Sequence, residues 1–158
     1  MAFEKAKAYL DQKGFGDRVK EFAVSSATVE LAAQAVGCQP ARIAKTLSFL
    51  VEGKAILIVA AGDAKVDNHK YKEKFHTKAK MLSAEEVAEL VGHAVGGVCP
   101  FGVKDGVRVF LDESLKRFEI VYPACGSSNS AVELTIPELE LCSGYEEWVD
   151  VCKGWTEA

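Results

Sequence analysis

Two neighbouring blocks of apolar and β-branched residues form the clearest pattern in this sequence. Thr46–Val51 and Lys54–Ala61 each predict a strand, and Glu52-Gly53 between them is typical of a hairpin turn. The second block is apolar on both faces, which predicts a strand at the centre of a sheet. Shorter blocks predict further strands at Val19–Val24, Val107–Leu111, Phe118–Tyr122, Ser130–Thr135 and Trp148–Cys152.

Helix start and stop signals separate these strands. Ser83 and Thr135 each begin a capping box, in which a Glu three residues later completes a reciprocal pair of hydrogen bonds. Apolar spacing predicts a helix over residues 3–13, which ends before Gly14, and a second over Thr28–Val36, which is capped by Ser25 or Ser26 and ends before Gly37. A short helix is predicted from Pro40 to near Lys45. A further short, exposed helix is predicted over the basic stretch Val66–Phe75.

The order of these elements indicates the fold class. Strands outnumber complete βαβ units, and the helices fall between groups of strands. This order predicts an α+β fold in which a mixed, mostly antiparallel sheet curls towards a barrel and is surrounded by helices. No repeat, low-complexity tract or linker divides the chain, so we expect a single domain over residues 1–158.

The charge pattern narrows the class of partner. The net charge of -4 over 158 residues excludes a basic protein that coats nucleic acid. Residues 65–80 nevertheless hold six lysines against Asp67 and Glu73, a local basic patch that can attract one end of an RNA. The longest apolar run, Ala55–Ala61, is far too short for a membrane helix, so we expect a cytoplasmic protein with no membrane partner.

Cysteine and histidine spacings bear on metal and thiol chemistry. The five cysteines form no Cys-x-x-Cys pair, and the three histidines show no ligand spacing with carboxylates, so we expect no metal and no cofactor. A thiol nucleophile stays open as an alternative, because Cys125 or Cys99 could pair with His93 as its base. Without such a role, His93 would be an exposed loop residue. No Gly-x-Ser-x-Gly or Gly-x-Gly-x-x-Gly motif is present.

Two glycine-rich loops are candidates for binding, Gly92–Gly102 and Cys125–Ser130. Glycine lets the backbone approach a ligand closely and present N–H groups to it. Pro100 stiffens the first loop, and a stiff loop can hold donors ready for a developing oxyanion. Each loop taken alone also fits a tight turn between strands. Lys45, next to an apolar strand, could anchor a phosphate or ribose oxygen.

Four motifs in order carry a resemblance to a known family. They are Lys45-Thr-Leu-Ser-Phe, Ala60-Ala-Gly-Asp63, Gly96-Gly-Val-Cys-Pro-Phe-Gly102, and Cys125-Gly-Ser-Ser-Asn-Ser-Ala-Val-Glu-Leu-Thr135 before Pro-Glu-Leu139. From about Val24 to Leu141 the chain resembles the YbaK/prolyl-tRNA-synthetase-associated domain family. That family includes the editing domain inserted in bacterial prolyl-tRNA synthetases and its free-standing relatives.

The resemblance implies a function and a set of site residues. It implies a free-standing enzyme that hydrolyses the ester of wrongly charged tRNA, with Lys45 as the residue needed for deacylation. It also implies that the substrate is bound by residues of the other three motifs, which are Asp63, Gly96, Gly97, Pro100, Phe101, Gly126, Ser127 and Asn129. The second glycine loop departs from some relatives, which carry more glycine or a basic residue there.

The implied partner is the acceptor end of an aminoacyl-tRNA, such as a tRNA-Pro that carries a small wrong amino acid, with an aminoacyl-tRNA synthetase as a second partner. Two other functions stay open on the residues alone. One is a non-catalytic module that binds an acceptor end or a synthetase, and the other is the cysteine-dependent hydrolase.

Overall fold

A long antiparallel hairpin organises the chain. In the computed structural model, which describes residues 2–94 and 96–155, β2 (Ile43–Val51) pairs with β3 (Lys54–Ala61) over eight residue pairs. Both turn residues have positive φ, 51° at Glu52 and 78° at Gly53. This conformation matches the right-handed twist of the two strands, and it confirms the hairpin that the sequence predicts.

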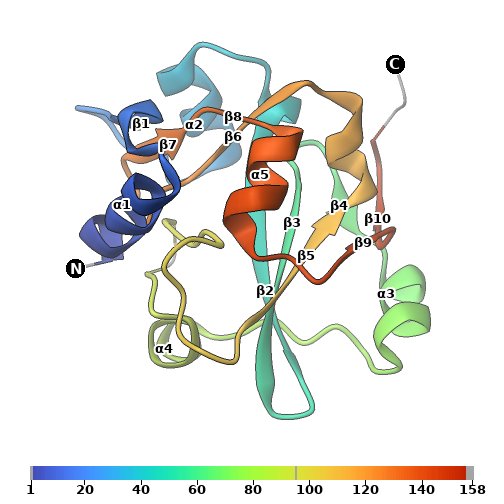
Figure 1. Ribbon diagram of the computed structural model, residues 1–158. Coiled ribbons are helices and arrows are strands. Elements are labelled where there is room, and N and C mark those ends of the chain that lie inside the picture. Colours follow the sequence, from blue (N-terminus) through green and yellow to red (C-terminus); the bar gives the residue numbers. More distant parts are fainter. Residues whose placement is uncertain (1, 95, 156–158) are drawn as a thin grey trace.

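Six strands form the main sheet, in the order β8-β6-β2-β3-β5-β9 (Figure 1). The four added to the hairpin are β5 (Arg108–Asp112), β6 (Ile120–Pro123), β8 (Leu134–Thr135) and β9 (Glu147–Val149). Two smaller antiparallel pairs join β1 (Val19–Glu21) to β7 (Ser130–Val132) and β4 (Lys65–Val66) to β10 (Cys152–Lys153). Within the main sheet β3 pairs in parallel with β5, β5 with β9, and β2 with β6.

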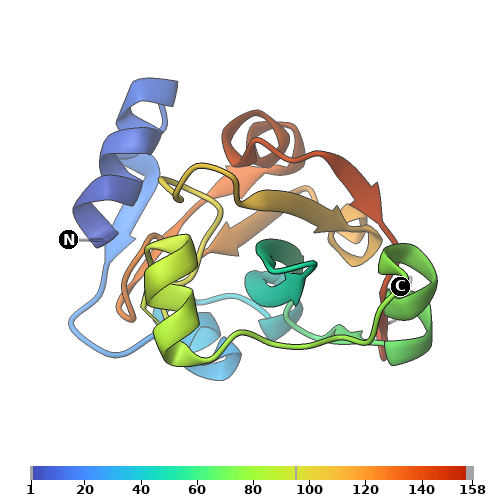
Figure 2. The same ribbon diagram turned by 90° about the horizontal axis from the view of Figure 1, so that it is seen from below.

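The helices lie around this curled sheet, as Figures 1 and 2 show. They are α1 (Ala2–Lys13), α2 (Val29–Val36), α3 (Asn68–Phe75), α4 (Ala84–Glu86) and α5 (Ile136–Ser143). A wider π-helical turn, Val87–Val91, continues α4, and short 3-10 turns occur at Gly16–Arg18, Pro40–Arg42 and Glu113–Arg117. The predicted fold class, α+β with a curled mixed sheet, is confirmed.

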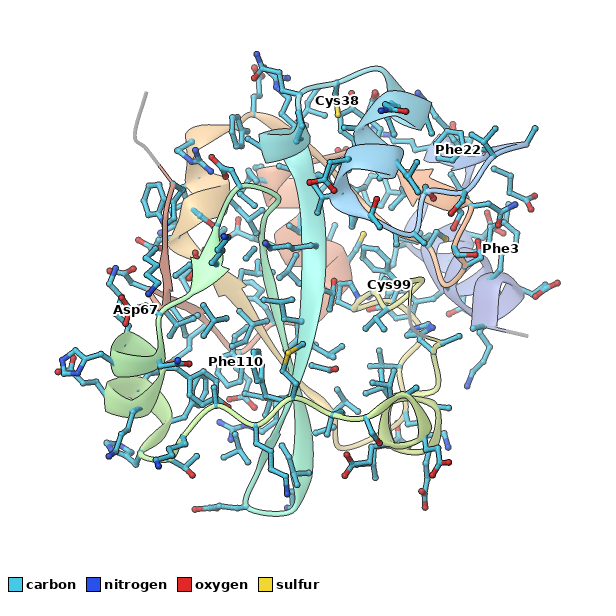
Figure 3. All side chains as sticks on the ribbon, turned by 180° about the vertical axis from the view of Figure 1, so that it is seen from behind. Phe3, Phe22, Cys38, Asp67, Cys99 and Phe110 are labelled. Carbon is cyan, nitrogen blue, oxygen red and sulfur yellow. The ribbon has the colours of Figure 1, made fainter. Side chains whose placement is uncertain are left out.

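The core is built on β3, which is buried along its length except at Lys54. Aromatic rings extend the core from the sheet to α3. The ring centroid of Tyr71 lies 5.0 Å from that of Phe49 and 4.8 Å from that of Phe75, and the Phe75 and Phe110 rings meet edge-on with centroids 5.1 Å apart. Figure 3 shows Phe110 beside the helix that follows Asp67. The predicted helix over the basic stretch is therefore not exposed all round, because Tyr71 anchors one face of it in the core.

Several predicted boundaries are wrong for identifiable reasons. β2 begins at Ile43, because Ile43 and Ala44 pair with β6, and Lys45 therefore lies inside the strand. The turn from Pro40 ends at Arg42. The cap of α2 is Thr28, whose hydroxyl accepts a hydrogen bond from Leu31 N at 3.2 Å, and not Ser25 or Ser26.

Other predicted strands are shorter or divided. The first covers only Val19–Glu21, where it pairs with β7. Residues 130–135 form two strands with different partners, since β7 pairs with β1 while β8 pairs with β6. The predicted closing strand is likewise divided into β9 and β10, which join different sheets.

The capping box of α5 gives a test of this local structure. Thr135 Oγ1 accepts from Glu138 N, and Glu138 Oε1 accepts from Thr135 N. Replacing Thr135 with Ala removes half of this exchange and should lower the free energy of unfolding by about 1 kcal/mol in urea titrations. Thr77→Ala, at an exposed position outside the helices and strands, should change it by less than about 0.5 kcal/mol. Equal stability of the two variants would contradict the role of the cap.

Candidate functional site

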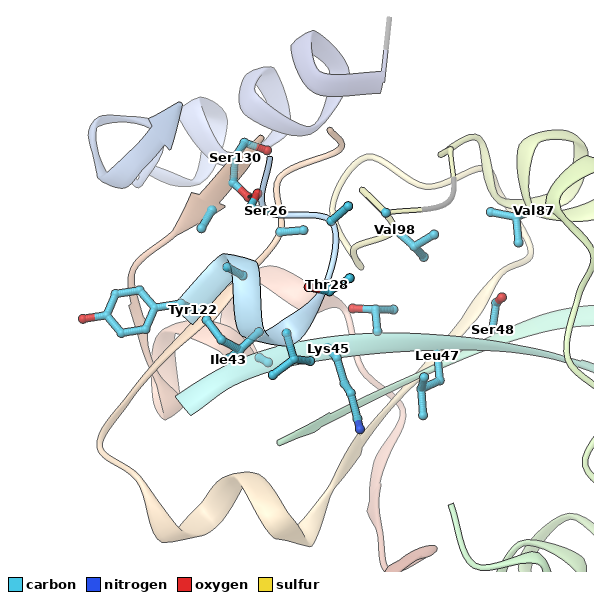
Figure 4. Close-up of a pocket in the computed structure, with 18 of the residues that line it drawn as sticks. Ser26, Thr28, Ile43, Lys45, Leu47, Ser48, Val87, Val98, Tyr122 and Ser130 are labelled. Carbon is cyan, nitrogen blue, oxygen red and sulfur yellow. Dashed lines mark hydrogen bonds between the residues drawn. The ribbon is translucent and has the colours of Figure 1, made fainter. Parts of the chain in front are cut away.

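A cleft of about 300 Å³ opens beside the first half of β2 (Figure 4). Its walls are mostly apolar, with a few hydroxyl groups and one ammonium group among them. The lining residues come from five places in the chain. They are Ser26–Val29 and Ala32 at α2, Ile43–Ser48 of β2, Met81, Leu82 and Val87 around α4, Gly96 and Val98 of the first glycine loop, and Tyr122, Ala124, Ser130 and Ala131 near β6 and β7.

Lys45 lies on this wall, and strand geometry sets its direction. Successive side chains of a strand point to opposite faces, and Figure 4 shows Lys45 on the opposite side of β2 from Ser48 and Val98. The ammonium donates to Gly62 O at 3.5 Å in a partly buried position. Burial lowers the pKa of Lys45, while the nearby Cys152 and Asp63 side chains act in the other direction.

The first glycine loop contributes Gly96 to the cleft and packs closely on the second loop. Gly96 has a φ of +93°, a conformation that a larger residue adopts only with strain. A Cβ at Gly97 would lie 2.5 Å from Ser127 N, so nothing larger than glycine fits between the two loops. The loops thus brace each other beside the cleft.

Hydrogen bonds hold the second glycine loop to the chain before α2. Asn129 Nδ2 donates to Phe22 O at 3.1 Å, and Phe22 N donates back to Asn129 O at 2.8 Å. Ser127 Oγ lies 2.7 Å from Ser130 Oγ and so fixes a residue of the cleft wall. Gly126 packs against the N-terminus of α1, where a Cβ would lie 2.5 Å from Ala2 O. The predicted residues Gly126, Ser127 and Asn129 therefore shape the wall from behind.

Pro100 and Phe101 lie near the C-terminal end of the first glycine loop. Both are buried, and the ring of Phe101 stacks on Tyr9 at 6.4 Å between centroids. Phe101 O accepts a hydrogen bond from His93 Nε2 at 2.9 Å. His93 is 1% exposed, so the prediction of an exposed loop histidine is wrong. This buried layer supports the part of the loop that reaches the cleft.

Asp63 lies in the turn after β3 and does not line the cleft. Its carboxylate takes a bidentate pair of hydrogen bonds from Arg117, at 2.9 and 2.5 Å, and the Arg117 side chain is 8% exposed. These bonds hold the pKa of Asp63 below its usual range. The pair fixes the turn whose Gly62 carbonyl accepts from Lys45. The Asp63 carboxylate therefore makes a structural contact with Arg117, next to Gly62, whose carbonyl oxygen accepts from Lys45.

The cysteine and histidine pairing proposed from sequence is partly present in the structure. Cys99 Sγ lies 3.6 Å from His93 Nε2. Both Cys99 and Cys125 are fully buried, and neither lines the cleft. Burial raises the pKa of Cys99 and raises that of Cys125 to about 12, so both thiols stay protonated at neutral pH. A thiolate nucleophile is therefore poorly supported by this geometry.

Sequence reasoning missed much of the cleft wall. Ser26, Ser48, Val98 and Ser130 line it, and none of them was named as a site residue, although Ser48, Val98 and Ser130 lie within the motifs that carry the family resemblance. Only Lys45 and Gly96 among the predicted site residues line the cleft directly. The signal available for Ser48, Val98 and Ser130 was their position inside these motifs, whereas Ser26 lies outside all four of them.

Neither a metal cluster nor a membrane span occurs in the described part of the chain. Among residues 2–94 and 96–155, no three His, Cys, Asp or Glu side chains gather as a metal site would require. In the same residues, no helix is both long and apolar enough to cross a membrane.

Comparison with known proteins shows the family. The sequence model of the aminoacyl-tRNA editing domain matches residues 24–141, and the chain belongs to that family. A solved structure of a candidate trans-editing enzyme for prolyl-tRNA synthetase superposes with a TM-score of 0.87 and 32% identity, covering 97% of this chain and 98% of that one.

Curated relatives extend the comparison. The uncharacterized protein YwhH of Bacillus subtilis is 53% identical over 156 residues, which cover 98% of this chain and 99% of that protein. Proline--tRNA ligase of Bacillus licheniformis is 31% identical over 90 residues, which cover 56% of this chain and 16% of the ligase. The match therefore covers about half of this chain and a small part of the ligase.

The buried histidine gives a pH prediction. Burial lowers the pKa of His93, whereas in the unfolded chain the ring has a pKa of about 6.5. Between the two pKa values, His93 is protonated in the unfolded state and neutral in the folded state. The contribution of the neutral ring to the free energy of unfolding is fully present at pH values above the pKa of the unfolded state. It is lost as pH falls from there through the folded-state pKa, by at most about 1.4 kcal/mol per pH unit.

Urea unfolding of the wild type and His93→Gln, measured from about pH 7.5 down to about pH 5, tests this effect. The free energy of unfolding should fall more steeply with decreasing pH in the wild type than in the variant. Parallel curves would show that His93 is not held neutral by its surroundings.

Proposed function

We propose that this protein is a free-standing deacylase that hydrolyses the ester bond of mischarged aminoacyl-tRNA. The observation that supports this most is the composition of the cleft in a chain of the editing family. Its volume of about 300 Å³ lies at the lower end of the usual range of small-molecule sites. A cleft of this size with apolar walls suits a small amino acid attached to the terminal ribose.

The reaction requires little chemistry from side chains. A water oxygen adds to the ester carbonyl carbon, the bond from that carbon to the ribose oxygen breaks, and the ribose oxygen takes one proton of the water, which leaves a free amino acid and a ribose hydroxyl. Because the aminoacyl ester is activated, positioning and oriented dipoles supply much of the catalysis. The backbone at Gly96, held by the packing of the two glycine loops, is placed to orient the ester or the water.

Lys45 has a separate role in this proposal. Its flexible stem allows the ammonium to exchange the Gly62 carbonyl for a phosphate or ribose oxygen of the acceptor end. The turn that carries Gly62 is fixed by the Asp63–Arg117 pair, so the ammonium starts from a defined position.

A panel of mischarged tRNAs tests the proposal directly. Alanyl- and cysteinyl-tRNA-Pro, with correctly charged prolyl-tRNA-Pro as control, are incubated with the protein, and loss of the ester is followed. We expect hydrolysis of at least one mischarged tRNA well above the spontaneous rate. Binding of these tRNAs without any ester loss would favour the alternative of a non-catalytic binding module.

The Lys45 ammonium provides the second prediction on function. Lys45→Ala removes a charged hydrogen bond, which typically contributes about 1.5–3 kcal/mol, so kcat/KM should fall about tenfold to 150-fold or more. Lys45→Arg should also be impaired, because a planar guanidinium does not replace a compact ammonium. Lys20→Ala, at an exposed position of β1, serves as control. Wild-type rates in both Lys45 variants, with unchanged melting temperatures, would refute this role.

Two lysines of the basic patch, Lys78 and Lys80, come just before residues that line the cleft, and they predict the salt dependence of tRNA binding. Lys80 O accepts from Leu50 N, and the next two residues line the cleft. No ion pair holds Lys78 or Lys80 among the residues that the structure describes, whereas Lys70 and Lys74 are paired with Asp150 and Glu147. Lys78 and Lys80 are therefore available to tRNA phosphates.

The double variant Lys78→Gln/Lys80→Gln should weaken tRNA binding. It should also reduce the slope of log K against log salt concentration by about 0.7–0.9 for each phosphate that the variant no longer neutralises. Lys13→Gln/Lys20→Gln carries the same change in net charge on α1 and β1. Equal slopes for the two double variants would show that only net charge matters.

A further inference from the structure

One edge of β2 has a gap in its pairing. On the side away from β3, β6 pairs with Ile43 and Ala44 only. Further along the same edge, the chain at residues 80–82 takes over, with Leu82 N donating to Ser48 O at 3.2 Å and Leu50 N donating to Lys80 O at 2.8 Å. Between these contacts the strand edge faces the cleft.

Strand geometry shows that the unpaired backbone groups in this gap belong to Thr46. The N–H and C=O groups of alternate residues in a strand point to the same side. Because Ser48 O and Leu50 N point away from β3, the N–H and C=O of Thr46 also point away from it. No described residue forms a backbone hydrogen bond with either group. Thr46 therefore presents one donor and one acceptor, side by side, to the cleft.

The Thr46 side chain adds a third polar group. Thr46 lies on the same face of β2 as Ser48, which Figure 4 shows pointing towards Val87 and Val98. Its Oγ1 is buried and has no hydrogen-bond partner among the described residues, although the residue as a whole is partly exposed. A turn of about 120° about χ1 moves this hydroxyl to the position that the methyl group now occupies, from which it can meet a ligand in the cleft.

The chemistry of an unpaired strand edge indicates its ligand. Two residues opposite each other in an antiparallel hydrogen-bonded pair exchange both N–H···O bonds. An α-amino acyl group has the same two functions, an amine that donates and a carbonyl that accepts. A peptide added to a sheet edge is held in this way, and its side chain is read by a neighbouring pocket.

We propose that Thr46 is the positioning residue that binds the α-amino acyl group of the substrate as an added strand residue. This rests on the proposed function. Thr46 N–H donates to the ester carbonyl oxygen, and Thr46 C=O accepts from the α-amine, which the hydroxyl contacts as well. The side chain of the amino acid then lies along the apolar wall. The site thus recognises the amine and carbonyl common to all α-amino acids, and the apolar wall limits the size of the substrate's side chain.

The substrate's amine tests the proposal with the unaltered protein. Alanyl-tRNA-Pro is compared with the same tRNA carrying a propionyl ester, which differs only in lacking the amine. Because the amine also activates the ester, kcat/KM for each ester is divided by its uncatalysed hydrolysis rate at the same pH, and we expect this ratio to be lower for the propionyl ester by about tenfold or more. Equal ratios for the two esters would overturn the assignment to Thr46 and leave deacylation intact. No hydrolysis of either ester would overturn the proposed function and this inference with it.

Two variants test the hydroxyl without disturbing the backbone. Thr46→Val keeps the shape of the side chain and should raise KM for alanyl-tRNA-Pro about threefold to tenfold, while Thr46→Ser should stay near the wild type. Removing a buried hydroxyl that has no partner should leave the melting temperature unchanged or raise it. A lower melting temperature with unchanged KM would assign the hydroxyl a structural role and overturn its part in binding.

Discussion

The pairing of β2 is the constraint on which the rest of the structure depends. One edge is fixed along eight residue pairs to β3, the strand that forms the centre of the core. The other edge is shared between β6 and the chain at residues 80–82, which leave a gap at Thr46. A strand that is rigid on one side and open on the other can present backbone groups in fixed directions at little cost in conformational entropy.

The surroundings of the gap follow from this arrangement. Segments far apart in the sequence converge on the open edge, and each is braced by contacts behind it. The two glycine loops are packed too closely for a Cβ at Gly97, and Asn129 ties the second loop to Phe22. Arg117 holds the turn that offers Gly62 O to Lys45. The cleft wall is thus preorganised by residues that do not themselves line it.

The sequence predicts those parts of the fold that depend on neighbours in the chain. The β2–β3 hairpin, both capping boxes and the glycine that ends α2 are set by local chemistry, and all are confirmed. The start of β2 depends on a partner strand near residue 122, so local pattern placed it too late. Asp63 belongs to a matching motif, but the arginine that binds it is distant in sequence. Motif order therefore indicated residues in and around the cleft, while the directions of their side chains became clear only from the fold.

The most direct test of this account observes the open edge itself. An adenosine that carries alanine through a 3′-amide, in place of the ester, mimics the substrate's terminus and is not hydrolysed. Titrating it into isotope-labelled protein and following backbone amide shifts by NMR would report binding residue by residue. The account predicts a saturable change at the Thr46 amide, accompanied by changes at Gly96 and Val98. Saturable changes elsewhere, with the Thr46 amide unaffected, would contradict it.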